Sequence, residues 1–156
     1  MSNRRAQIRL DPAEQLELLE TERIVVVSSW GPRGWPHSMP LWYVPRSGEV
    51  WIYTYARSQK VLNLERDPRA TLLLETGHEY GELRGVEIQA EAEIHREIEV
   101  VYELARELAI RYSGGSASID EEAAEALRAQ AAKRVAVRFE ARRTASWDHR
   151  KLGSGH

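Results

Sequence analysis

The ten residues from Val86 to His95 alternate without a break between apolar and polar side chains. A period of two residues predicts a β-strand that buries one face and exposes the other. Shorter apolar or aromatic runs at 24–27, 50–55, 70–74 and 135–139 predict further strands, and 35–44 predicts an irregular extended run. Because tight turns join most of these runs, we expect antiparallel pairing.

The helical stretches lie mainly at the start of the chain and before its last strand. Asp11 and Pro12 mark the beginning of one helix, and apolar residues recur at helical spacing over 98–112 and in an alanine-rich stretch at 120–132. A doubly wound sheet would need regular alternation of strands and helices, which the sequence lacks. The pattern favours a mainly β (α+β) fold, a closed or nearly closed antiparallel barrel decorated by helices.

Composition limits the classes of function. A chain of 156 residues with 42% hydrophobic content predicts one globular domain, with residues 1–10 and 153–156 as flexible ends. The net charge of −2 gives no general attraction to nucleic acid or to an anionic membrane. There is no cysteine, and the five histidines show no metal-binding spacing, so we expect no metal site. Without a signal peptide or an apolar span, the expected location is the cytoplasm.

Residues Thr54 to Arg69 join a strand to a short helix. Ser58 can cap this helix, which should end before Asp67 and Pro68. A helix N-terminus favours an anion because its N–H groups are unpaired, and Arg57, Ser58 and Lys60 add a guanidinium, a hydroxyl and an ammonium group. The junction therefore predicts a phosphate site. The alternative is a turn whose basic residues are simply solvated.

Several short segments occur in the order typical of one known family. They are Gly34-Trp-Pro-His37, Pro40-Leu-Trp42, Ser58-Gln-Lys60, Asn63-Leu64 and Asp67-Pro-Arg69. From about Thr21 to Leu152 the chain resembles the pyridoxamine 5′-phosphate oxidase-like split-barrel family, especially the branch that binds the deazaflavin coenzyme F-420. The resemblance implies a single cofactor-binding domain built on a six-stranded or slightly larger antiparallel split β-barrel.

The same resemblance implies which residues bind the cofactor. For the phosphate they are Lys60 and Asn63, with Thr54, Arg57 and Ser58 close by. For the tricyclic ring they are His37, Met39, Pro40 and Trp42 on one strand, and Trp147 in a C-terminal segment. Ordinary core packing is the alternative for Trp42, and plugging of the barrel end is the alternative for Trp147. No side chain is assigned a catalytic role.

The resemblance also bears on the kind of cofactor. The chain lacks the Arg-x-x-Leu-Leu-Lys flavin segment and the basic C-terminal motif of pyridoxamine 5′-phosphate oxidases proper, so oxidation of vitamin B6 is not expected. Ser58-Gln-Lys60 and Ser146-Trp-Asp-His149 look closer to the deazaflavin branch. Coenzyme F-420 is therefore the expected cofactor, and flavin mononucleotide (FMN) is the alternative because it also places a phosphate on a ribityl chain.

These expectations define the leading function and its rivals. The resemblance implies an oxidoreductase that moves a hydride between bound F-420 or FMN and a small organic acceptor, as a homodimer with sites at the subunit interface. The rivals are a non-catalytic flavin-binding or carrier protein, and a haem-handling protein with His37 or His78 as the iron ligand. No residue in the predicted site identifies the acceptor.

Overall fold

A computed structural model describes residues 3–115 and 118–153. Its strands are β1 (Val25–Trp30), β2 (Pro36–Leu41), β3 (Val44–Arg46), β4 (Glu49–Tyr55), β5 (Arg69–Thr76), β6 (Arg84–His95) and β7 (Arg134–Asp148). Its α-helices are α1 (Arg4–Gln7), α2 (Pro12–Thr21), α3 (Gln59–Arg66), α4 (Ile98–Tyr112) and α5 (Glu121–Ala131). Two short 3-10 helices, η1 (Tyr80–Glu82) and η2 (His149–Leu152), lie at the tip of the β5–β6 hairpin and at the end of β7.

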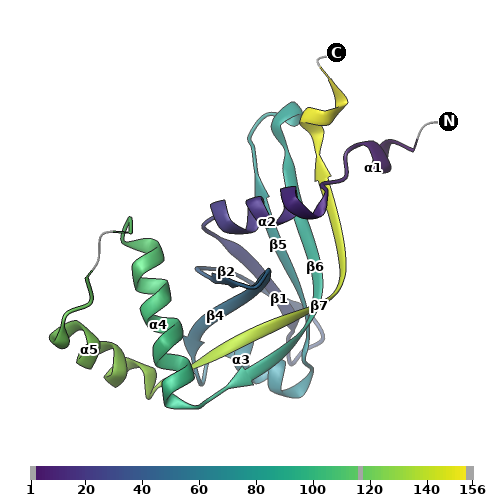
Figure 1. The fold of residues 1–156 in the computed structure, drawn as a ribbon. Helices are drawn as coiled ribbons and strands as arrows, with labels where there is room; N and C mark the ends of the chain where they lie inside the picture. Colours follow the sequence, from purple (N-terminus) through teal and green to yellow (C-terminus); the bar gives the residue numbers. More distant parts are fainter. Residues whose placement is uncertain (1–2, 116–117, 154–156) are drawn as a thin grey trace.

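All seven strands form one antiparallel sheet in the order β2-β1-β5-β6-β7-β4-β3. The sheet curls into a half-barrel, and its two edge strands are β2 and β3 (Figure 1). This confirms the expected split barrel, with one strand more than six. The expected extended run at 35–44 is divided into β2 and the start of β3, because Trp42 and Tyr43 leave the sheet between them.

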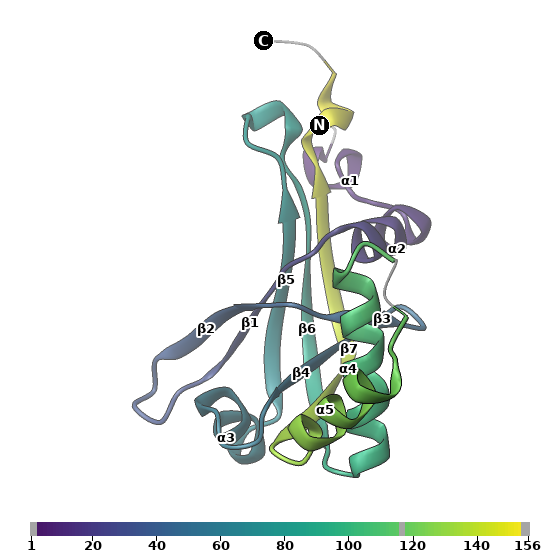
Figure 2. The ribbon, with the colours of Figure 1, turned by 90° about the vertical axis from the view of Figure 1, so that its left-hand side faces the viewer.

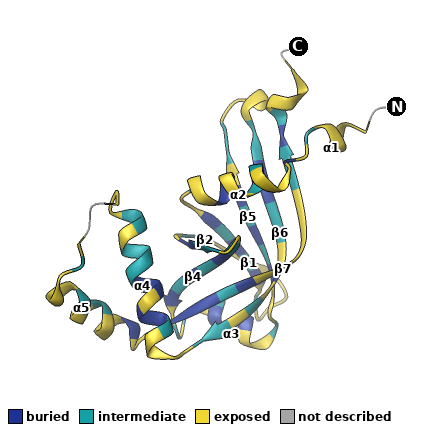
Figure 3. Ribbon diagram, in the orientation of Figure 1, coloured by how far each residue is buried: buried dark blue, intermediate teal, exposed yellow. Residues whose placement is uncertain are grey.

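The main core lies inside the curl of the sheet. Its fully buried members include Val25 and Val27 from β1, Ile52 from β4 and Leu72 from β5 (Figure 3). The apolar face of α3 adds Val61 and Leu64 to this core, so the helix after β4 is fixed in place by burial. The remaining helices lie elsewhere: α2 crosses the sheet near β5 and β6, while α4 and α5 pack beside β3, β4 and β7 (Figure 2).

Strand β7 is longer than the sequence suggested. The expected strand at 135–139 extends to Asp148, so Ser146 and Trp147 belong to the sheet rather than to a separate segment after the last strand. The chain start is tied to the same place, since Asp148 N–H donates to Ile8 C=O and Leu10 N–H donates to Ser146 Oγ. Residues 154–156 of the expected C-terminal tail lie outside the described residues.

In the described parts of the chain, none of the helices has the length and apolar character that crossing a lipid bilayer requires.

Candidate functional site

The junction between β4 and α3 has the local structure that the sequence predicted. Ser58 is the N-cap residue in extended conformation, and Leu62 N–H donates to its carbonyl in the first helical turn. The helix ends at Arg66, and the N–H of the C-cap residue Asp67 donates to Asn63 C=O before Pro68 stops the helical pattern. The chain thus brings Thr54, at the end of β4, beside the first turn of α3.

Lys60 is the central charge of this junction. Its ammonium group donates to Thr54 Oγ1 at 3.1 Å, and the side chain is only partly exposed. Among residues 3–115 and 118–153, no carboxylate forms an ion pair with it. Burial therefore lowers the pKa of Lys60 from its ordinary value, because the charged form loses water without gaining a counter-charge. A negatively charged ligand would supply that charge.

Ser58 and Arg57 add to this arrangement. The Ser58 Oγ is buried, and it has no hydrogen-bond partner in the described structure, even though its residue is at the cap position. Arg57 is exposed next to it. A buried hydroxyl that lacks a partner is costly, so this oxygen is suited to bind a ligand oxygen.

Asn63 is placed differently from the other four predicted phosphate residues. Its side chain is fully buried, and Nδ2 donates to Ser29 Oγ at 3.1 Å. Its Oδ1 accepts from Gln59 at 2.8 Å, and Arg66 lies within 3.4 Å of the same oxygen. The amide is therefore engaged by protein groups and ties α3 to β1.

Three of the predicted ring residues lie on strand β2. His37 and Met39 are opposite Ser29 and Val27 of β1, while Pro40 is opposite Val26 and faces the other side of the sheet. The His37 Nδ1 is buried without a partner among the described residues. His37 and Pro40 thus lie on opposite faces of β2.

Trp42 lies beyond the end of β2, against helix α4. Its ring stacks on Tyr112 with centroids 4.3 Å apart and an interplanar angle of 12°. At about 3.3 Å per residue, it is roughly 17 Å along the chain from His37. Even with this contact to Tyr112, Trp42 is 53% exposed.

Trp147 lies near the far end of β7. It is paired with Gly85 of β6, whereas Thr54 is opposite Val135 near the start of β7. The part of β7 from Val135 to Trp147 is roughly 40 Å long at about 3.3 Å per residue. Within one chain, the structure therefore does not bring Trp147 near Lys60.

The two histidines of the haem alternative are also apart. His37 is in β2, while His78 follows β5 in the turn that leads to η1. The described residues hold no group of three or more histidine or acidic side chains suited to a metal ion.

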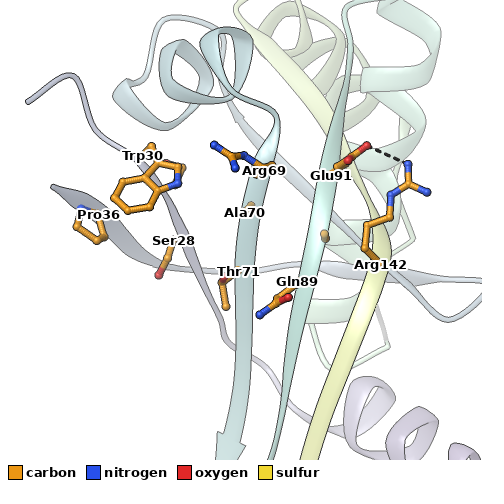
Figure 4. A pocket seen from close by; sticks show the side chains of 11 residues that line it. Ser28, Trp30, Pro36, Arg69, Ala70, Thr71, Gln89, Glu91 and Arg142 are labelled. Carbon is orange, nitrogen blue, oxygen red and sulfur yellow. Dashed lines mark hydrogen bonds and ion pairs between the residues drawn. The ribbon is translucent and has the colours of Figure 1, made fainter. Parts of the chain in front are cut away.

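A groove that the sequence did not predict lies on the outer face of the sheet. It has a volume of about 700 Å³, within the usual range of small-molecule sites. Figure 4 shows Trp30 and Pro36 on one side of it, Thr71 and Gln89 between, and Arg142 on the other side. None of the ten predicted cofactor residues lines this groove. The sequence feature that could have indicated the groove is the presence of polar Ser28 and Thr71 in otherwise apolar strands.

A β-bulge helps to form the far wall of the groove. Gln89 is opposite Arg143 while Ala90 is opposite Ala141, so Arg142 is an extra residue in β7. Its guanidinium forms ion pairs with Glu91 at 2.9 Å and with Glu140 at 3.3 Å. The bulge thereby holds a charged side chain at the rim of the groove.

Comparisons with known proteins identify the family of this chain. A family model described as pyridoxamine 5′-phosphate oxidase matches residues 11–148. The chain belongs to the pyridoxamine 5′-phosphate oxidase family. A search of curated proteins found no match.

Solved structures of the pyridoxamine 5′-phosphate oxidase fold include a similar protein from Mycobacterium tuberculosis, the conserved hypothetical protein Rv2991. It is 41% identical, with a TM-score of 0.89, and the match covers 99% of this chain and 95% of that one. An F420 reductase is 18% identical, with a TM-score of 0.62 and coverage of 83% and 94%. The haem-storage protein HutZ from Vibrio cholerae is 15% identical, with a TM-score of 0.66 and coverage of 90% and 98%. The last two show a shared fold only.

Proposed function

We propose that this member of the pyridoxamine 5′-phosphate oxidase family is an oxidoreductase that binds a phosphate-bearing flavin or deazaflavin. The observation that carries the proposal is the partly buried Lys60 ammonium beside Thr54, which has no carboxylate partner in the described structure. The unpartnered Ser58 hydroxyl and the N-terminus of α3 lie at the same junction. Together they suit a phosphate group.

The residues of the junction fit the phosphate end of either cofactor. Lys60 supplies the charge, Thr54 orients the ammonium group, Ser58 offers a hydroxyl, and Arg57 can reach a phosphate oxygen from the exposed side. When bound, F-420 or FMN supplies hydride transfer, while the protein provides position and electrostatics. Coenzyme F-420 is the preferred cofactor because of the motif Ser58-Gln-Lys60, and the F420 reductase of the same fold supports this choice.

The proposed enzyme is a homodimer in which the partner completes the cofactor site. Besides Trp30, four large aromatic residues are substantially exposed in the described part of the chain: Trp35, Trp42, Tyr55 and Tyr80. Such residues are enriched where protein surfaces meet. In such a dimer, Trp147 of one copy could approach the cofactor bound by the other copy, whereas it is too far from the cofactor bound by its own chain.

The direct experiment begins with the small molecule that copurifies with the protein, identified by absorbance and mass. The cofactor-free protein is then titrated with F-420 and, separately, with FMN, with binding followed by cofactor fluorescence. We expect F-420 to bind more tightly, and the reduced coenzyme to be oxidised when an organic acceptor is added. Binding without acceptor reduction would support a carrier instead, and failure to bind either cofactor would contradict the proposal.

A further inference from the structure

The groove on the outer face of the sheet has a floor of uncharged hydrogen-bonding groups. Ser28, Thr71 and Gln89 lie in one row across β1, β5 and β6, because each is the direct partner of the next. Ser28 and Ser38 bind each other through their hydroxyls at 2.8 Å. In the described structure, the side chains of Thr71 and Gln89 have no hydrogen-bond partner. Both are therefore available to a ligand.

One wall of the groove is apolar and flat. Trp30 ends β1 with 47% of its surface exposed, and Pro36 is its direct partner on β2. Figure 4 shows the Trp30 indole beside the groove, with Pro36 and Ser28 near it. An exposed indole next to hydrogen-bonding groups suits a planar ring. Such a ring can stack on the indole while the polar atoms at its edge form hydrogen bonds.

The charges around the groove are already balanced. Arg69 forms an ion pair with Asp67 at 2.6 Å, and this interaction lowers the pKa of Asp67 to about 2, so the pair stays charged near neutral pH. Arg142 is held between Glu91 and Glu140. Arg66 donates to the Trp30 carbonyl at the same groove. The three arginines thus face three carboxylates, which leaves no excess positive charge to attract an anion.

Helix α3 connects the groove with the proposed phosphate site. Its N-terminus carries Lys60, while Asn63 holds Ser29 beside the groove and Arg66 donates to the Trp30 carbonyl at 2.5 Å. From Lys60 to Arg66 the helix rises by roughly 9 Å. The groove is therefore supported by the same short helix that would hold the cofactor phosphate.

We propose that the groove binds a neutral, planar ring compound with carbonyl oxygens, stacked on Trp30 and hydrogen-bonded by Thr71 and Gln89. This inference rests on the proposed function, and it assigns the groove to the organic acceptor of the hydride. The hydroxyl of Thr71 and the amide of Gln89 donate to the carbonyl oxygens, and the indole covers one face of the ring. The balanced ion pairs exclude anionic analogues.

The test uses the purified full-length protein and menadione, a neutral planar quinone, with binding measured by equilibrium dialysis. We expect Thr71→Val and Gln89→Leu each to weaken binding roughly three- to tenfold, the effect of one neutral hydrogen bond. Trp30→Ala should weaken it by at least about tenfold through lost stacking and lost apolar contact. Naphthoquinone sulfonate, which has a similar ring with a negative charge, should bind at least about tenfold more weakly than menadione.

Matched controls lie outside the groove. Trp35→Ala removes a tryptophan that is 77% exposed at the β1–β2 turn, and Thr76→Val makes the same change as Thr71→Val at the other end of β5. Both should bind menadione as the unchanged protein does. Equal binding by all variants, or equal binding of the sulfonate, would overturn the inference. The inference would also be overturned if Trp30→Ala changed the mass measured by light scattering but left menadione affinity unchanged. That result would mean that this face of the sheet is an interface between copies of the chain.

The same measurement separates this inference from the proposed function. Lys60→Ala should leave menadione affinity unchanged, because Lys60 does not line the groove. Weak cofactor binding in that variant tests only the phosphate site. Conversely, a protein that binds menadione as described but binds neither F-420 nor FMN would retain the groove assignment and lose the proposed activity.

Discussion

Lys60 carries an ammonium group that the folded protein partly buries without a counter-charge. If a cofactor phosphate supplies that charge, Lys60→Ala should weaken cofactor binding by roughly 1.5–3 kcal/mol, the scale of a charge-assisted hydrogen bond. Arg57→Ala should act in the same direction. The measurement is fluorescence titration, with the exposed Lys133→Ala as a control for overall charge. Unchanged affinity in both Lys60→Ala and Arg57→Ala would remove the phosphate assignment.

The lowered pKa of Lys60 also predicts a pH dependence. Phosphate binding needs the ammonium form, so affinity should fall as the pH rises through the pKa of this lysine. Because burial lowers that pKa, the fall should begin at a lower pH than for an ordinary lysine, whose pKa is about 10.4. Titrations between about pH 7 and about pH 10 measure the effect. Lys60→Arg, which stays charged throughout, should bind with no such fall.

A single carbon atom added at Gly85 should destabilise the fold. A Cβ built there would lie 2.4 Å from the Trp147 ring and 2.8 Å from the Leu74 carbonyl oxygen. Gly85→Ala should therefore lower the free energy of unfolding by about 1–3 kcal/mol, the usual cost of overpacking. Thermal unfolding followed by circular dichroism measures it, with Gly81→Ala as the control because nothing lies within 4 Å of a Cβ at Gly81. An unchanged stability would mean that Trp147 is not packed on β6.

Among the elements, β7 makes the strongest prediction. Truncation after Thr144 removes the pairing of 145–148 with β6, and it removes the contacts of Ser146 and Asp148 with the start of the chain. We expect a lower melting temperature, because these contacts order both chain ends. Calorimetry of the truncated and full chains provides the comparison. A truncated protein with the original melting temperature but no cofactor affinity would instead place the segment in the site.

The sequence predicted most of the helices and strands, but it missed where some of them end. Alternation identified β6, and helical spacing identified α4, because each pattern is long enough to be unambiguous. The end of β7 was hidden because residues 140–145 are all exposed, so neither face shows an apolar period. Here the strand is specified by its hydrogen bonds to β6, which no residue pattern reveals.

The candidate site was predictable only where it is local. Thr54, Ser58 and Lys60 meet because a strand and a helix follow one another within a few residues. The groove joins five strands, and its residues become neighbours only through the register of the sheet. The burial of Asn63 was likewise invisible, since its partner Ser29 is 34 residues away in the chain.

For the whole molecule, we predict a stable homodimer. One chain has a mass of 17.9 kDa, so light scattering at micromolar concentration should give about twice that value. The reason is the exposure of several large aromatic side chains, which a lone chain would leave in water. A mass close to that of one chain over this concentration range would contradict the prediction.

The bulge at Arg142 has a consequence for how this family can change in length. Ala141 and Arg143 are opposite Ala90 and Gln89, which are neighbours in β6, so every residue except Arg142 already has regular pairing. A relative without this residue would keep each remaining side chain on its present face of the sheet. Most single deletions within a strand reverse the faces of all residues that follow. We therefore expect gaps of one residue among homologous chains to be tolerated at this position of β7.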